Sequence, residues 1–148
     1  MVWDGAKGGR YSQPREFRSA ANDVVSTVDD YHAYFRMLLN GGMHGSERIL
    51  SRPAVQLMTG NCLTPAQEAA RTALAGNNVR VSFGQGQQGG WGFGMAMRTY
   101  RGDYAPIGRF GWDGGTGTTV YADPANQLTG VLLTQVGLSV PDPARVAS

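Results

Sequence analysis

Residues 108–135, GRFGWDGGTGTTVYADPANQLTGVLLTQ, decide the fold of this chain. Residues 118–122 are β-branched and aromatic, residues 123–126 (Asp-Pro-Ala-Asn) are typical of a turn, and residues 128–134 are mostly apolar. This order predicts a β-hairpin. Just before it, four glycines surround Trp112, which lets the backbone come close to a ligand or to another segment. We therefore expect a binding site at this edge of the sheet.

The sequence upstream predicts three helices. Ser26 with Asp29 is a variant of the capping box at a helix start, and Gly41 with Gly42 ends that helix. Its apolar positions fall on one stripe with two more at the margins: Val28, Tyr31, Phe35 and Leu38, then Tyr34 and Leu39.

Two shorter helices are expected to follow. One comes after Ser51, with Pro53 suited to its first turn and Val55, Leu57 and Met58 on it. The other opens at Thr64-Pro65 and closes at Gly76.

The region between the helices and the hairpin divides into two parts. Residues 77–90 are rich in Gly, Gln and Asn and predict a weakly ordered loop, which could hold an edge strand through Val79, Val81 and Phe83. Residues 91–97, WGFGMAM, alternate large and small side chains and predict one strand. Its bulky face is expected to enter the core and its small face to receive a closely packed element, most simply a helix. Helices followed by antiparallel strands predict an α+β fold, an antiparallel sheet with packed helices.

Length, charge and cysteine content narrow the classes of protein to which this chain could belong. The 148 residues suit one domain, and the formal charge of +2 comes mostly from scattered arginines, which makes a nucleic-acid partner unexpected. Cys62 is the single cysteine, so it forms no disulfide within the chain, and we expect it to be buried. No apolar run approaches the roughly 20 residues of a membrane span, and the first ten residues lack the apolar core of a signal peptide, so we expect a soluble chain whose cellular location is unknown.

The order of motifs in the hairpin region resembles a known family. Trp112-Asp113-Gly114, Gly117, a strand, an Asp-Pro turn and a Leu-rich strand ending at Gln135 resemble the C-terminal third of the serine β-lactamase and penicillin-binding-protein family. Class C β-lactamases and their esterase relatives are the nearest in pattern.

Three further segments extend the resemblance to nearly all of the chain, from about Ser19 to the end. Residues 25–31 (VSTVDDY) are similar to the S-T-x-x-D helix start of the family, and residues 37–42 (MLLNGG) to its L-L-x-G-G helix end. Residues 141–146 (PDPARV) are similar to the segment that opens its C-terminal helix.

The resemblance implies a partial β-lactamase/transpeptidase-like fold with a site on this strand. Trp112, Asp113 and Gly114 match the substrate-binding Lys-Thr-Gly positions, which read His-x-Gly or Trp-x-Gly in many esterase-like members, and the Gly115 N–H matches the second oxyanion-hole donor. From the residues alone, packing is the preferred role of Trp112, whereas the resemblance favours the wall of the cleft. Trp112 replaces the cationic lysine of the family, and Asp113 replaces its neutral hydroxyl residue. Both changes disfavour binding of the negatively charged carboxylate of a β-lactam, so we expect an esterase or peptidase-like activity of the parent protein.

The acylating residues of the family are missing from this sequence. Serine acyl transfer needs a nucleophile and a base within reach, which the family takes from Ser-x-x-Lys and Tyr-x-Asn motifs. Lys7 is the only lysine and stands three positions after Asp4, and no tyrosine is followed two positions later by Asn. A Gly-x-Ser-x-Gly elbow is absent as well. His32 and His44 lack metal-ligand spacing, and His44 with Ser46 resembles an ordinary turn more than a catalytic pair, so we expect neither metal nor cofactor.

We therefore expect the C-terminal portion of a β-lactamase-like serine hydrolase that is inactive alone. The alternative is a non-catalytic binding or partner module of the same fold. The expected organisation is a single domain or fragment over 1–148, with an arm at 1–18, a helical part at 19–76, a loop at 77–90, and the sheet with the start of a C-terminal helix at 91–148.

The strands carry more apolar surface than the three helices can cover, so we expect self-association or pairing with a missing N-terminal half. The expected apolar surface comprises Leu128, Val131, Leu132 and Leu133 with Trp91, Phe93 and Met95.

Overall fold

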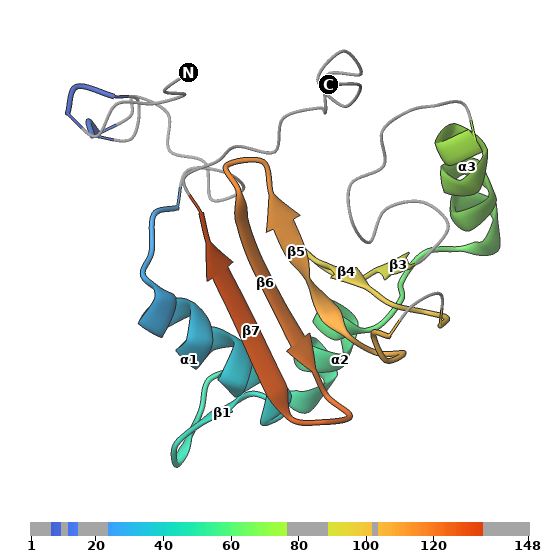
Figure 1. Cartoon of the computed structure of the whole chain (residues 1–148). Coiled ribbons are helices and arrows are strands. Elements are labelled where there is room, and N and C mark those ends of the chain that lie inside the picture. Colours follow the sequence, from blue (N-terminus) through green and yellow to red (C-terminus); the bar gives the residue numbers. More distant parts are fainter. Residues whose placement is uncertain (1–6, 10–11, 15–23, 77–88, 102–103, 135–148) are drawn as a thin grey trace.

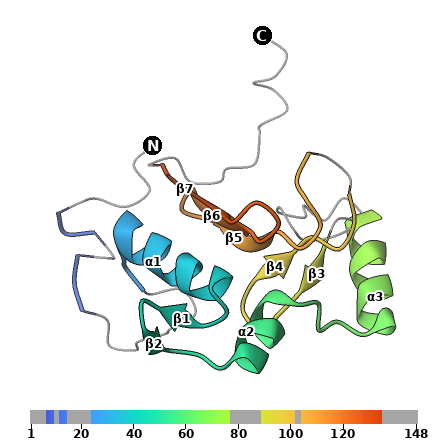
Figure 2. The ribbon, with the colours of Figure 1, turned by 90° about the horizontal axis from the view of Figure 1, so that it is seen from below.

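A five-stranded antiparallel sheet in the strand order β3-β4-β5-β6-β7 forms the centre of the computed structural model (Figure 1). The structure describes residues 7–9, 12–14, 24–76, 89–101 and 104–134. Residues 77–88 of the predicted loop 77–90, the predicted segment 141–146 and most of the expected arm 1–18 lie outside these residues. Figure 2 shows α1 and α2 beneath one face of the sheet, with α3 beside the β3 edge. This arrangement confirms the predicted α+β class.

Strands β6 (Thr118–Asp123) and β7 (Leu128–Leu133) form the predicted hairpin, and β5 (Phe110–Gly114) pairs with β6 on its other side. In the register of β6 and β7, Val120 faces Val131. The Asp123 carboxylate accepts hydrogen bonds from the N–H groups of Ala125 and Asn126 at 2.9 and 3.2 Å, which closes the turn. The side chain of Asp123 therefore stabilises the turn that joins the two strands.

Helix α1 (Val28–Leu39) starts one residue later than the capping prediction. Thr27, not Ser26, is the N-cap residue, and its hydroxyl accepts a hydrogen bond from the Asp30 N–H at 3.2 Å. At the other end, Gly41 and Gly42 adopt positive φ angles of 62° and 93°, as the sequence predicted for a helix stop.

Helix α1 supplies most of the helical part of the core. Phe35 and Leu38 are buried as predicted, and Met37, which the stripe did not include, is buried with them. The Phe35 ring stacks on the Phe110 ring of β5 with centroids 6.0 Å apart. The buried core cluster comprises Phe35, Met37, Leu38, Val55, Met95, Phe110, Val120 and Ala122.

The remaining helices follow the predicted bounds. Helix α2 (Arg52–Thr59) is capped by the Ser51 hydroxyl and has its proline in the first turn, and α3 (Pro65–Gly76) follows. A two-stranded hairpin, β1 (Met43–His44) and β2 (Glu47–Arg48), joins α1 to α2.

Two expectations from the sequence were wrong. Residues 91–97 are not one strand, because β3 (Gly90–Trp91) turns at Gly94 (φ 100°) and pairs with β4 (Ala96–Met97). Gly92 in this turn does receive the closely packed helix: a Cβ there would lie 2.1 Å from the Met58 carbonyl oxygen at the end of α2. Cys62 is exposed rather than buried, because it follows α2 in a surface connection.

The two faces of the sheet have different surroundings. Helix α1 contacts β6 and β7 on one face, where Val131 packs against the core. On the opposite face, which we call the second face, Leu128 and Leu132 remain 62% and 60% exposed. Among the described residues, no helix has the length and apolar character that crossing a bilayer requires.

Candidate functional site

Trp112 lies in the middle of β5 on the face that α1 covers, directly opposite Val120 of β6. Its ring meets the Trp91 ring edge to face, with centroids 4.9 Å apart and an interplanar angle of 84°. Trp112 is half-buried. The ring therefore packs against Trp91 and also lines a cavity.

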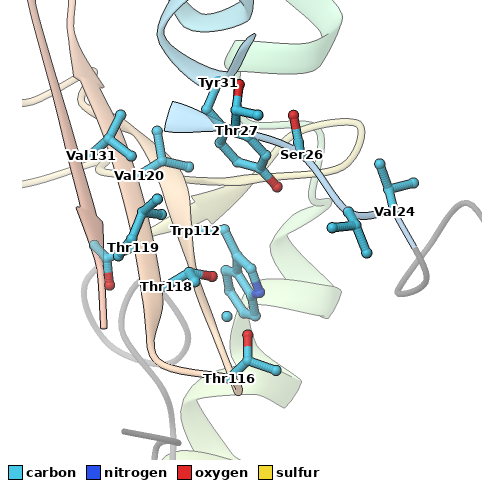
Figure 3. Close-up of a pocket in the computed structure, with 13 residues that line it drawn as sticks. Val24, Ser26, Thr27, Tyr31, Trp112, Thr116, Thr118, Thr119, Val120 and Val131 are labelled. Atoms are coloured by element: carbon cyan, nitrogen blue, oxygen red, sulfur yellow. The ribbon is translucent and has the colours of Figure 1, made fainter. Parts of the chain in front are cut away.

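A cavity of about 370 Å³ opens between the start of α1 and the β5–β6 hairpin (Figure 3). Its size falls within the range of small-ligand sites. Val24 and Val25, which precede α1, line one side. Figure 3 shows Val24 across the opening from Val120 and Val131 of the sheet. The remaining lining residues are Ser26, Thr27, Tyr31, Gly114, Thr116, Thr118, Thr119, Val120, Val131 and Leu133.

Gly114 and Gly115 stand where β5 ends beside this cavity. Gly114 lines it, and a Cβ at Gly114 would lie 2.9 Å from the Thr118 hydroxyl oxygen. Gly115 is exposed in the turn between two lining residues, and within the described part of the chain its N–H has no hydrogen-bond acceptor. An exposed N–H at this position is able to donate to an oxygen of a bound molecule.

Asp113 points away from the cavity, because successive residues of a strand face opposite sides of the sheet. Asp113 is buried, with 7% of the residue exposed, and its carboxylate accepts hydrogen bonds from the Thr119 hydroxyl at 2.7 Å and the Tyr121 hydroxyl at 2.5 Å. The structure thus separates Asp113 from Trp112 and Gly114, which the sequence grouped in one wall. In the folded chain the Asp113 carboxylate joins β5 to β6 on the second face.

The surroundings of Tyr121 favour its protonated form. Burial, followed by the hydrogen bond to Asp113, raises the pKa of the Tyr121 hydroxyl above its ordinary value. The Arg109 guanidinium lies 4.2 Å from the centre of the Tyr121 ring and acts in the opposite direction. Sequence reasoning missed this cluster, although alternation from Trp112 onward could have assigned Asp113 to the same face as Thr119 and Tyr121.

The start of α1 leaves negative charge beside the cavity. Asp29 and Asp30 occupy the first turn, and Asp30 accepts hydrogen bonds from Thr27 at 3.0 Å and Ser26 at 3.5 Å. The Thr27 side chain also caps the helix, so the end of α1 is occupied by groups of the chain itself.

The described residues hold no group of three or more His, Cys, Asp or Glu side chains arranged for a metal ion. His44 lies exposed in β1 and His32 exposed on α1. Neither histidine lines the cavity.

An antiparallel sheet covered by helices on one face is an α+β arrangement, and the cavity at the end of the glycine-flanked strand has the size of a small-molecule site. The chain belongs to the β-lactamase family, because the family model described as Beta-lactamase matches residues 2–147. This confirms the resemblance found in the sequence.

Two curated relatives from Mycobacterium tuberculosis are similar to the chain. Protein Rv1367c of strain H37Rv is 33% identical over 148 aligned residues, which cover 95% of this chain and 35% of the relative. Uncharacterized protein MT1414 of strain CDC 1551 / Oshkosh shows the same identity and coverage. The chain therefore spans about a third of the length of these relatives.

Proposed function

We propose that the chain forms the C-terminal part of a serine hydrolase of the β-lactamase family, with an esterase or peptidase-like acyl-transfer activity. In this proposal Trp112 and Gly114 contact the substrate, and the Gly115 N–H donates to the developing oxyanion. The nucleophile and the base are supplied by other residues of a longer protein. In this proposal Asp113 does not contact the substrate; its hydrogen bonds to Thr119 and Tyr121 of β6 hold β5, the strand that carries these groups.

The observation that carries the proposal is the position of the cavity. Trp112 and Gly114 both line it, and the exposed N–H of Gly115 lies at the adjoining turn. A preorganised N–H donor beside an apolar cavity is the arrangement that acyl transfer requires for its oxyanion. The lack of Ser-x-x-Lys and Tyr-x-Asn in this sequence supports the assignment of acylation to other residues.

The test compares this chain with a longer protein that contains it. A fluorophosphonate probe should label the longer protein on one serine, whereas this chain alone should remain unlabelled by intact mass. Stoichiometric labelling of a serine in this chain would contradict the division of roles.

The oxyanion assignment has its own pair of variants in the longer protein. Gly115→Pro removes the N–H and should lower kcat for a p-nitrophenyl ester by about 10²- to 10³-fold. Gly115→Ala keeps the N–H, and its Cβ would meet nothing within 4 Å, so it should retain most of the activity. Thermal melting of both variants separates catalytic loss from unfolding, and equal kcat values for the two folded variants would remove Gly115 from the site.

The second candidate is a non-catalytic binding module of the same fold. The observation in its favour is that residues of this chain alone form the cavity. A longer protein that binds esters or amides but is neither labelled by the probe nor able to turn them over would favour this module.

We also propose that the second face pairs with another part of the longer protein, or with a second copy of this chain. The apolar strand residues that the sequence grouped into one surface lie in two places. Met95 is buried and Val131 packs against the core, whereas Leu128 and Leu132 are exposed on the second face. Removing apolar surface from water contributes about 25 cal/mol per Å². Sedimentation at increasing concentration should show association that Leu132→Glu weakens and Leu57→Glu, on exposed α2 surface, does not.

A further inference from the structure

The described residues that line the cavity carry no charged side chain. None of them is Asp, Glu, Lys, Arg or His. Trp112, Tyr31 and Val120 supply aromatic and aliphatic surface, while Thr116 and Thr118 supply hydroxyl groups at the hairpin end. The lining therefore offers contact area and a few hydrogen bonds, but no counter-charge for an ionic ligand.

The N-terminus of α1, which adjoins the cavity, also disfavours an anionic ligand. A helix N-terminus attracts anions through its unpaired N–H groups, but at α1 the Thr27 side chain already accepts from the Asp30 N–H. The Asp29 and Asp30 carboxylates occupy the same turn, and Asp30 is hydrogen-bonded to two lining residues, Ser26 and Thr27. An anionic ligand would meet repulsion there in addition to losing its hydration.

We propose that this cavity binds an uncharged ligand with an aromatic or branched apolar body, a neutral ester or amide rather than a carboxylate. The identification of that ligand as a substrate rests on the proposed function. The binding preference itself rests only on the lining and on the charges beside it.

The experiment measures binding to this chain, with no turnover involved. Phenylacetamide and phenylacetate have nearly the same shape and differ in charge, so they form a matched pair of probes. In ¹H–¹⁵N correlation spectra, millimolar phenylacetamide should shift the Trp112 indole N–H and the Gly114 and Thr116 amides. Its affinity should exceed that of phenylacetate by about tenfold or more, because a buried carboxylate would lack a partner.

A pair of adjacent leucines provides the control. Leu133 lines the cavity and Leu132 lies on the second face, and the two are 53% and 60% exposed, so lysine is tolerated sterically at both. Leu133→Lys should raise the affinity for phenylacetate several-fold, whereas Leu132→Lys should leave it unchanged.

Two results would overturn the proposal. One is equal affinity of the unmodified chain for both probes, and the other is the absence of shifts at the cavity with phenylacetamide. Because the unmodified chain is measured first, these results do not depend on how the variants fold. A longer protein that lacks hydrolase activity would contradict the proposed function but would leave the binding result unaffected.

Discussion

Removing the Tyr121 hydroxyl tests the link between β5 and β6 on the second face. Tyr121→Phe deletes the donor that lies 2.5 Å from the carboxylate of Asp113, a buried residue that is 7% exposed. Thr119 then remains as the hydroxyl donor at 2.7 Å. A hydrogen bond to a charged group contributes about 1.5–3 kcal/mol to the free energy of unfolding. At about 2–4 °C per kcal/mol for a chain of this size, the melting temperature should fall by about 3–12 °C.

Urea denaturation and thermal melting would measure this change. Tyr104→Phe is the matched control, because Tyr104 is fully exposed, and it should change stability by less than about 0.5 kcal/mol. A double-mutant cycle with Asp113→Asn should give a coupling energy of at least about 1 kcal/mol between the two side chains. Equal stability of the Tyr121→Phe and Tyr104→Phe variants would refute the reasoning.

The pH dependence of the same pair has a definite sign. The folded chain raises the pKa of Tyr121 above its ordinary value of 10, so folding favours the protonated hydroxyl. The stabilising contribution of this group is therefore complete below pH 10 and is lost as the pH rises through the higher folded pKa. The stability difference between the unmodified chain and Tyr121→Phe should be constant from pH 7 to about 9 and should shrink only at higher pH.

Three further variants or reactions test the packing, the helix start and the surface. Gly111→Ala should lower the free energy of unfolding, measured by urea denaturation, by at least about 2 kcal/mol. The added Cβ would lie 2.0 Å from the Val120 carbonyl oxygen of β6, and the backbone φ of 152° disfavours a side chain. Gly130→Ala should be tolerated, because a Cβ there meets nothing within 4 Å. Thr27→Ala should cost about 1 kcal/mol in the same assay by removing the cap of α1, and Thr27→Ser should restore most of it. Cys62 should react with a thiol reagent in the absence of denaturant, because it is exposed, and a reaction that requires urea would contradict its position.

Part of the site could be predicted from the sequence because strand and turn signals act locally. The glycines around Trp112 and the turn residues after β6 located the strand end where the cavity lies. The cavity itself could not be predicted, because its two sides come from residues 24–31 and 112–133, which only the packing of α1 on the sheet brings together. The role of Asp113 was missed for the same reason, since its partners lie on the neighbouring strand.

By itself, the sequence determined the elements whose signals lie within a few residues. The turn at Asp123, the glycine stop after α1 and the proline in the first turn of α2 each depend on side-chain or φ preferences that act locally. Tertiary structure decided the features that depend on distant neighbours. Residues 91–97 form a hairpin rather than one strand, because the chain turns at Gly94 (φ 100°) and Trp91 pairs with Ala96. Likewise, the exposure of Cys62 and the two environments of Trp112 follow from how the layers pack, which no periodicity within a single segment encodes.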